Sequence, residues 1–169
     1  SLHSGDFRAS EKTFQLVTQA AGRAGRGKRP GKVIIQTYQP DHYAIIASGR
    51  QNFEEFYEQE MTYRRLLKYP PSCEMLVIFC TAPKEQDCRE ALNRMANHLK
   101  MTCKNPSTIF IGPSEGAFPK IKDIYRRVLY IKEQNSEYIN EVRCIAEDYA
   151  KSDEIFKKVH VYYDKNPMG

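Results

Sequence analysis

The sequence has 169 residues, with 26 lysines and arginines against 21 aspartates and glutamates, which gives a formal net charge of +5. No apolar stretch is long enough to cross a bilayer and no signal-peptide pattern is present, which argues against a membrane partner. The five cysteines form an odd set without a C-x-x-C pair, which argues against a disulfide framework or a zinc site and indicates reduced, mostly buried thiols of a cytosolic protein.

The first predicted element is a helix over residues 8–21. Ser10 is its expected N-cap, and apolar residues from Phe14 onward recur at helical spacing. Gly22 and Gly25 are expected to end the helix, because glycine weakens helical backbone.

The run from Gln19 to Arg26, Q-A-A-G-R-A-G-R, spans the end of that helix. Core packing would not produce it, because glycine weakens a helix and a buried guanidinium needs a partner. Arginine presents a planar fork of donors that suits phosphate oxygens, and glycine lets a backbone approach closely. The run therefore indicates contact with a polyphosphate, with a solvated basic turn as the alternative.

Three further elements are expected in the first half of the chain: a strand over residues 33–38, a helix near 41–48 and a helix over 52–67. Asn52 and Glu55 have the spacing of a capping box at the start of the last helix. Pro70 and Pro71 end this helix and mark the expected domain boundary.

The second half predicts the order β-α-β-β-α-β, the split βαβ or ferredoxin-like pattern of an α/β (α+β) fold. Strands are expected at 75–81, 108–111, 125–132 and 159–163. Two helices with similar apolar offsets are expected between them, carried by Cys88, Ala91, Leu92, Met95, Ala96 and Leu99, and by Tyr138, Val142, Ile145, Ala146 and Tyr149. We expect Leu92, Met95, Val142 and Ile145 to be buried under a four-stranded sheet with both helices on one face.

A cluster of cations surrounds residues 116–119, G-A-F-P, which are expected to form a loop between two strands. Lys120, Lys122 and Arg126 are candidate contacts to DNA phosphates, because lysine and arginine fix position on a backbone without reading its sequence. The alternative, which we weigh equally, is a charged hairpin that keeps an edge strand soluble.

Two tyrosines accompany these cations. Tyr125, a further candidate DNA contact, and Tyr130 could stack on bases, although aromatic residues at strand spacing more often pack a core. Arg127 is expected to point to the opposite face of its strand from Arg126. The glycine–aromatic strand signature of RNA-recognition modules is missing, which argues against that module.

The glutamine–glycine–arginine run resembles the last signature motif of superfamily 2 helicases, and the sequence around it resembles the bacterial primosomal replication-restart helicases. The resemblance covers nearly the whole chain and is carried by D-F-R-A-S-E-K-T-F-Q-L from Asp6, G-K-V-I-I-Q-T-Y from Gly31, Pro40, His42, F-Y-E-Q-E from Phe56, Arg64, Y-P-P from Tyr69, Gly112-Pro113, Lys120-Ile121-Lys122 and Tyr125-Arg126. It implies that residues 1–50 end the second RecA-like motor lobe, 51–71 form a connecting helix with the proline boundary, and 72–169 form a C-terminal α/β domain.

The resemblance implies catalytic roles for Arg23 and Arg26, with Arg26 as an arginine finger on the ATP γ-phosphate. It implies that Gln19, Gly22 and Gly25 contribute to ATP binding. The parent protein would be an ATP-dependent 3′-to-5′ DNA helicase of the bacterial cytoplasm, associated with the nucleoid. It would recognise stalled replication forks and initiate primosome assembly, with forked or branched DNA, single-stranded DNA-binding protein and other primosome proteins as partners.

The chain has no G-x-x-x-x-G-K-[ST] loop and no acidic motif placed to hold Mg²⁺. We therefore expect this chain to be inactive by itself. The resemblance implies a longer parent, in which ATP and Mg²⁺ bind and cysteines upstream of this chain hold zinc. We expect the piece to be a monomer. The chain itself is expected to hold no metal. The alternative is a non-catalytic nucleic-acid-binding module with a ferredoxin-like fold, in which the arginine run is a basic tail.

Overall fold

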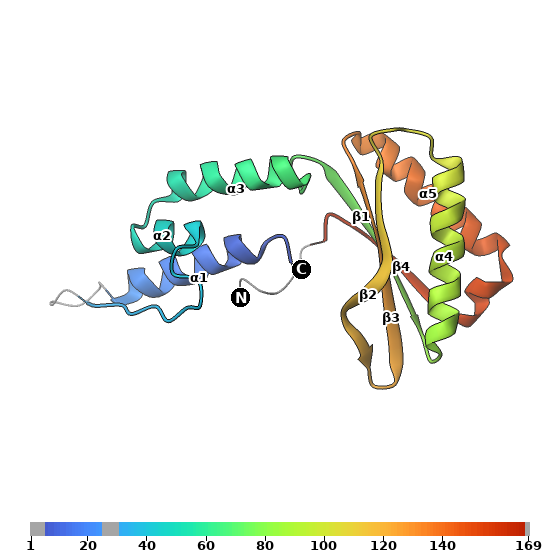
Figure 1. Ribbon diagram of the computed structural model, residues 1–169, viewed down its shortest axis with the longest axis horizontal. Helices are drawn as coiled ribbons and strands as arrows, with labels where there is room; N and C mark the ends of the chain where they lie inside the picture. The colour runs from blue at the N-terminus through green and yellow to red at the C-terminus, as the bar shows by residue number, and fades with distance from the viewer. Residues whose placement is uncertain (1–5, 25–30, 168–169) are drawn as a thin grey trace. The chain divides into compact units, whose positions relative to one another are not determined.

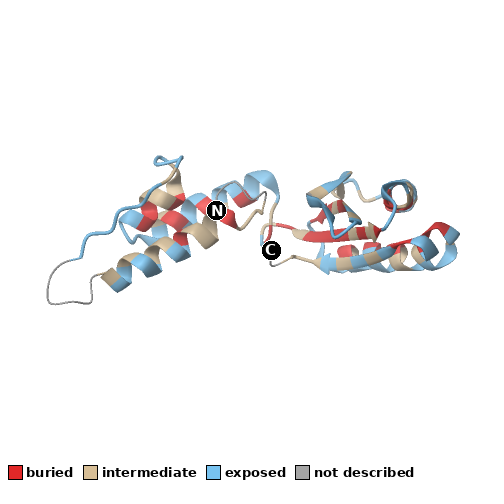
Figure 2. Ribbon diagram, turned by 90° about the horizontal axis from the view of Figure 1, so that it is seen from below, coloured by how far each residue is buried: buried red, intermediate tan, exposed pale blue. Residues whose placement is uncertain are grey.

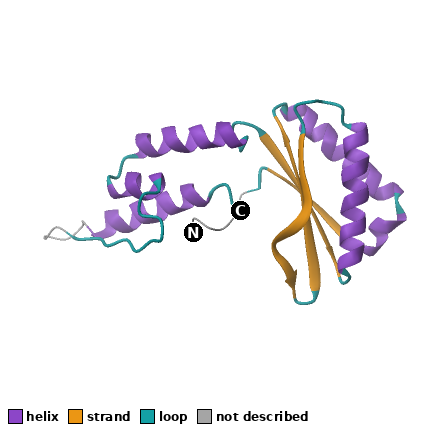
Figure 3. Ribbon diagram, viewed as in Figure 1, coloured by secondary structure: helices purple, strands orange, loops and turns teal. Residues whose placement is uncertain are grey.

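The computed structural model describes residues 6–24 and 31–167, which form a mixed α/β protein (Figure 3). The chain divides into two compact units, Ser1–Leu67 and Lys68–Met168, each with its own apolar core. The elements are α1 (Ala9–Ala24), α2 (Tyr43–Gly49), α3 (Phe53–Leu67), β1 (Glu74–Ala82), α4 (Glu85–Thr102), β2 (Ile109–Ile121), β3 (Ile124–Glu133), α5 (Ser136–Ser152), the short 3-10 helix η1 (Glu154–Lys158) and β4 (His160–Lys165). Among the described residues, no helix has the length and apolar content to cross a membrane.

The first unit packs its three helices around a small core. Phe14 of α1 stacks on Phe56 of α3 with ring centroids 4.3 Å apart. Ala44 and Ala47 of α2 are fully buried in the same cluster. Two of these four core side chains are alanines, so the aromatic pair supplies most of the apolar contact between α1 and α3.

Helix α1 begins one residue later than predicted and has a different N-terminal cap. The Asp6 carboxylate accepts a hydrogen bond from the Arg8 N–H at 2.9 Å, and the Asp6 carbonyl accepts one from the Ala9 N–H at 2.9 Å. Ser10 lies inside the first turn, so its prediction as the N-cap was wrong. An aspartate satisfies the free N–H groups of a helix start as well as a serine does.

The end of α1 also differs from the prediction. The helix passes through Gly22 and continues to Ala24. One glycine costs a helix about 1 kcal/mol relative to alanine, which is too little by itself to end a helix whose neighbouring residues, such as Ala20 and Ala21, favour helical backbone. Gly25 lies outside the described residues.

The strand predicted over residues 33–38 was wrong, because these residues form no regular element. Ile34 and Tyr38 are 84% and 97% exposed. A strand needs a neighbour with which to exchange backbone hydrogen bonds, and the described part of the first unit contains no other strand.

Helices α2 and α3 confirm two predicted segments, near 41–48 and over 52–67. His42 caps α2 through its Nδ1 atom. Only half of the predicted capping box forms at α3. The Asn52 side-chain oxygen accepts a hydrogen bond from the Glu55 N–H at 3.1 Å, but the Asn52 N–H donates to the Ala47 carbonyl at 2.9 Å.

The second unit has the predicted β-α-β-β-α-β order. Its four strands form an antiparallel sheet in the order β2-β3-β1-β4, a ferredoxin-like arrangement. Helices α4 and α5 lie together on one face of this sheet (Figure 1). The buried residues appear in Figure 2 as bands along the strands and on the facing sides of the helices, and they include Leu76, Ile78, Leu92, Met95, Leu99, Leu129, Ile131 and Val142.

Small departures from the predicted core have local causes. Ile145 is only partly buried, because Ala146, the next residue of α5, occupies the fully buried position. Val159 ends η1, so β4 starts at His160. Strands β1 and β3 confirm the predictions at 75–81 and 125–132.

Strand β2 is longer than predicted and contains residues 116–119, so the loop expected there was wrong. Its register against β3 shifts twice, the second time across these residues. The chain reverses later, at Lys122 and Asp123, whose φ angles are 48° and 62°. Proline is tolerated because β2 is an edge strand, and the N–H on the outer side of an edge strand has no partner to lose.

A buried carboxylate ties the end of β3 to the segment before β2. Glu133 is 1% exposed. It accepts hydrogen bonds from the hydroxyls of Ser107 and Thr108 at 2.7 and 2.5 Å, and from the N–H groups of Gln134 and Asn135 at 2.8 and 3.1 Å. Burial alone would raise the pKa of Glu133, but these hydrogen bonds favour the charged form and hold the pKa below its ordinary value.

We expect Glu133→Gln to lower the free energy of unfolding of the second unit by about 2 kcal/mol at pH 7, because an amide cannot accept from all of these donors. A lowered folded pKa gives stabilisation that is complete above the unfolded value and is lost as pH falls through the folded pKa. The wild-type chain should therefore lose stability as pH falls below the ordinary value of 4.5, and the variant should lose less.

Urea unfolding followed by circular dichroism between pH 7 and pH 3 measures both effects. Glu137→Gln is the matched control, because Glu137 is exposed in the first turn of α5 and should change stability by less than about 0.5 kcal/mol. Parallel pH profiles for the wild type and Glu133→Gln would show that the carboxylate has no such role.

Candidate functional site

The last turns of α1 present three residues of the glutamine–glycine–arginine run. Gln19, Gly22 and Arg23 are exposed, and their i, i+3, i+4 spacing places them on one face of the helix. A Cβ atom added at Gly22 would meet nothing within 4 Å, so packing in this chain does not require a glycine there. The space beside Gly22 is open to an approaching group. Gly25 and Arg26 lie outside the described residues.

The chain returns to the end of α1 after residues 25–30. A Cβ atom added at Gly31 would overlap the carbonyl group of Ala24, the last residue of the helix. Gly31 therefore lies against the α1 terminus at a point with no room for a side chain.

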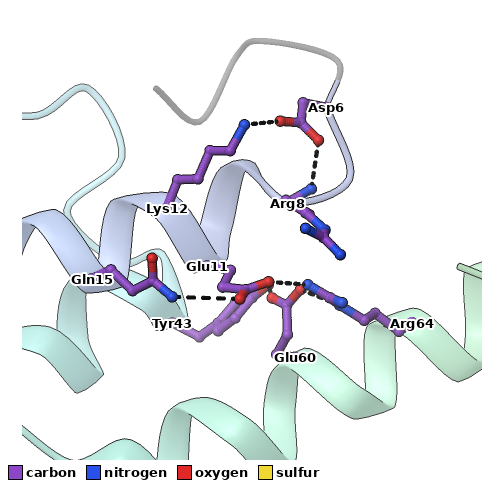
Figure 4. A network of polar contacts seen from close by, with 8 residues as sticks. All are labelled: Asp6, Arg8, Glu11, Lys12, Gln15, Tyr43, Glu60 and Arg64. Carbon is purple, nitrogen blue, oxygen red and sulfur yellow. Dashed lines mark hydrogen bonds and ion pairs between the residues drawn. The ribbon is translucent and has the colours of Figure 1, made fainter. Parts of the chain in front are cut away.

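A chain of polar contacts fastens α1 to α3 and α2 (Figure 4). Arg64 of α3 donates to Glu11 of α1 at 2.8 Å and to Glu60 at 2.6 Å. Glu60 also accepts a hydrogen bond from the Tyr43 hydroxyl at 2.6 Å. The side chains of Arg64 and Glu60 are 10% and 8% exposed. Each charged group has therefore lost most of its contact with water and is stabilised by its partner instead.

The same contacts keep Tyr43 protonated. Burial first, and then the neighbouring Glu60 carboxylate, raise the pKa of Tyr43 well above its usual range. The Tyr43 hydroxyl therefore stays protonated at neutral pH and can donate to Glu60. This network sets the position of the helix on which Gln19 and Arg23 lie.

The second candidate region is the β2–β3 hairpin, where two of the four predicted DNA contacts are already engaged. Lys120 Nζ lies 2.8 Å from the Asp123 carboxylate and 5.0 Å from the centroid of the Tyr125 ring. Tyr125 is partly buried against the core on the helix side of the sheet. These contacts leave Lys120 and Tyr125 less available to a ligand than the sequence suggested.

The other cations of the hairpin divide by face. Arg127 lies on the helix side and pairs with Glu85 at 3.0 Å, with Glu115 at 3.8 Å. Arg126 is exposed on the opposite face, as predicted from strand alternation. In the part of the chain that the structure describes, neither Arg126 nor Lys122 forms an ion pair. These two cations are therefore available to an anionic ligand.

A cavity of about 130 Å³ lies near the turn of the hairpin, lined by Glu85, Glu115, Pro119, Lys120, Tyr125, Arg126 and Arg127. The two carboxylates oppose the binding of a phosphate there. Over residues 6–24 and 31–167, no group of three or more His, Cys, Asp or Glu side chains could hold a metal ion.

Comparison with known proteins finds relatives that match nearly the whole chain. No protein-family model matches the chain. Over 168 residues, 99% of this chain, the sequence is 39% identical to the replication restart protein PriA of Bacillus subtilis and 38% identical to that of Chlamydia pneumoniae. PriA of Treponema pallidum is 30% identical over 161 residues, 90% of this chain. The chain is homologous to the PriA replication restart proteins.

The match lies in the C-terminal region of the PriA proteins, and the chain spans about a fifth of their length, 21% for Bacillus subtilis and 22% for Chlamydia pneumoniae. Among solved structures, the designed protein Foldit4 has a TM-score of 0.42 and 14% sequence identity, over 57% of this chain and 99% of that protein. Similarity at that level supports no conclusion about function.

The network of Figure 4 was not predicted as a site, although its residues have a pattern in the sequence. Phe56, Glu60 and Arg64 follow one another at i+4 spacing, so two charges occupy the helix face that begins with a buried phenylalanine. Charges on a buried face indicate a partner on another element. That partner, Glu11, lies far away in the sequence and could not be assigned from spacing.

Breaking this network should loosen the first unit. We expect Arg64→Ala to destabilise it by about 3–5 kcal/mol, because Glu60 would keep a buried charge without its cation. Arg50→Ala is the control, since Arg50 forms an exposed pair with Glu55 and should cost less than about 1 kcal/mol. Amide hydrogen exchange of α1 and α3 measures both variants, and equal protection in the two would contradict the role of Arg64.

Proposed function

We propose that this chain is the C-terminal part of an ATP-dependent 3′-to-5′ DNA helicase that recognises stalled replication forks and initiates primosome assembly. The observation that carries the proposal is 39% identity to a replication restart protein over 99% of the chain. Residues 1–50 are assigned to the end of the second motor lobe, 51–71 to a connection and 72–169 to the C-terminal domain.

The α1 terminus is assigned to the ATP site of the full-length protein. Gln19 and Gly22 would contact the nucleotide with Gly25, and Arg23 and Arg26 would stabilise charge that develops on the γ-phosphate. The open space beside Gly22 and the exposed guanidinium of Arg23 fit the approach of a phosphate group. The phosphate cradle and the Mg²⁺ ligands would come from sequence outside this chain, as would the cysteines that bind zinc.

The C-terminal domain is assigned to contacts with forked DNA and with single-stranded DNA-binding protein and other primosome proteins in the bacterial cytoplasm. Of the candidate DNA contacts, Lys122 and Arg126 are favoured over Lys120, which is paired with Asp123. The rival explanation, that these cations protect an edge strand from aggregation, is weakened because prolines and two register shifts already interrupt β2.

Arg26→Ala tests the catalytic assignment in the full-length protein. We expect kcat for DNA-stimulated ATP hydrolysis to fall on the order of 10³-fold, the scale of an arginine finger. ATP affinity should change much less, because the interaction strengthens in the transition state. This chain by itself should hydrolyse no ATP. A near-normal kcat for Arg26→Ala in the full-length protein would remove the assigned role.

Gly22→Ala separates stability from activity. The added methyl group meets nothing among the residues that the structure describes, so α1 should gain up to about 1 kcal/mol of stability. If a phosphate approaches the helix at this point, ATPase activity of the full-length variant should fall despite the gain. Thermal unfolding of the chain and ATPase assays of the full-length protein measure the two effects, and unchanged activity would argue against close approach at Gly22.

A further inference from the structure

The sheet of the second unit has one face that α4 and α5 do not cover (Figure 1). Strand alternation assigns to this face the residues that are absent from the helix-side core, including Val77, Phe79, Ile111, Val128, Tyr130 and Tyr162. We call these six residues the helix-free face. The two tyrosines that the sequence suggested as possible stacking residues lie on opposite faces. Tyr125 lies on the helix side and packs against the core, and Tyr130 lies on the helix-free face.

Three aromatic side chains cross the helix-free face, one on each of three neighbouring strands. Phe79 of β1 is paired with Tyr162 of β4. Tyr130 of β3 is paired with Val77, two residues before Phe79 in β1. Neighbours of this kind are about 5 Å apart across strands and roughly 7–8 Å apart on the diagonal. Tyr162 is 56% exposed and Phe79 and Tyr130 are partly exposed, whereas Val77 and Val128 are 0% and 3% exposed. The aromatic residues, and not the valines, are therefore the accessible part of this face.

A cation without an ion-pair partner lies beside these rings. Arg126 precedes Val128 by two residues in β3, which places it on the same face about 7 Å along the strand. It is exposed, and over the described residues it has no acidic partner. Lys122 is exposed at the turn of the same hairpin. The face thus combines flat apolar rings with positive charge at its hairpin end.

The opposite end of the face is covered. The Tyr69 ring lies 3.6 Å from Lys132 Nζ, and Met75 beside it is 3% exposed. Asp164 of β4, which is paired with Val77, adds one carboxylate to this end of the face. A ligand attracted by charge would therefore lie over the Phe79–Tyr162 row and extend toward Arg126.

We propose that the helix-free face binds single-stranded DNA, with bases stacked on Tyr162 and Phe79 and a backbone phosphate on Arg126. Proteins that bind single strands without sequence preference combine aromatic stacking surfaces with cations along the backbone. A duplex does not fit this surface, because its bases are already paired and stacked. The proposal deepens the proposed function, on which it rests, by naming the strand state of the DNA and the face that receives it.

The experiment uses the 169-residue chain and a fluorescein-labelled 20-mer of thymidine, with a 20-base-pair duplex as the second probe. Fluorescence anisotropy should give Tyr162→Ala an affinity for the single strand about tenfold weaker than wild type, with duplex affinity unchanged. Tyr162→Phe, which keeps the ring, should bind as wild type. Tyr57→Ala is the matched control, since Tyr57 is a 52% exposed tyrosine of α3, in the first unit.

Salt dependence separates the phosphate contact from stacking. Arg126→Ala should reduce the slope of log affinity against log salt by about 0.7 for the single strand, whereas Tyr162→Ala should leave the slope unchanged. Circular dichroism of each variant checks that the second unit is folded.

The proposal would be overturned if Tyr162→Ala bound the single strand with wild-type affinity. It would also be overturned if the variant lost as much affinity for the duplex as for the single strand. If duplex binding still depended on Lys122 and Arg126 in that case, the proposed function would stand and only the single-strand proposal would fall. The proposal would also be wrong if sedimentation showed a wild-type dimer that Tyr162→Ala converts to a monomer, because the face would then be an interface between copies of the chain.

Discussion

The packing of two amphipathic helices onto one face of a four-stranded sheet is the interaction on which the second unit depends. Burying a leucine or isoleucine such as Leu76 or Ile131 contributes about 1.5–3 kcal/mol, and alternation in a strand has a period of two. The core therefore determines what lies on the other face as well. A slip of one residue in β3 would bring Arg126 under the helices and turn Leu129 outward, so the apolar contacts fix the position of the aromatic and cationic residues.

The first unit has few apolar side chains to bury and relies more on polar contacts. Its aromatic pair, Phe14 and Phe56, meets beside the ion pairs between Glu11, Arg64 and Glu60. Both interactions join the same two helices. Helix α1 contributes Phe14 and Glu11 to these contacts and also carries the first residues of the glutamine–glycine–arginine run. The position of the run therefore depends on contacts made earlier in the same helix.

Helical periodicity predicted α4 and α5 almost residue by residue, because burial along one face of a helix is a local pattern. Two other predictions failed because they depended on neighbours. The β-branched run at 33–38 found no strand to pair with, and the glycine and prolines near 116–119 suggested a loop where an edge strand tolerates them. Of the candidate site, exposure of Gln19 and Arg23 follows from their place at the helix end, whereas the pairing of Glu11 with Arg64 could not be derived without the packing of α1 on α3.

The separate cores of the two units have a consequence for how the chain loses its structure. The cluster around Phe14 and the cluster around Leu92 share no residue, so melting of one core removes no side chain from the other. Such a chain need not unfold in an all-or-none step, and a single midpoint would then average two unrelated transitions. Cooperative unfolding is then a property of each unit separately. Substitutions in the core around Phe14 can change the rigidity of the first unit without changing the core of the α/β domain.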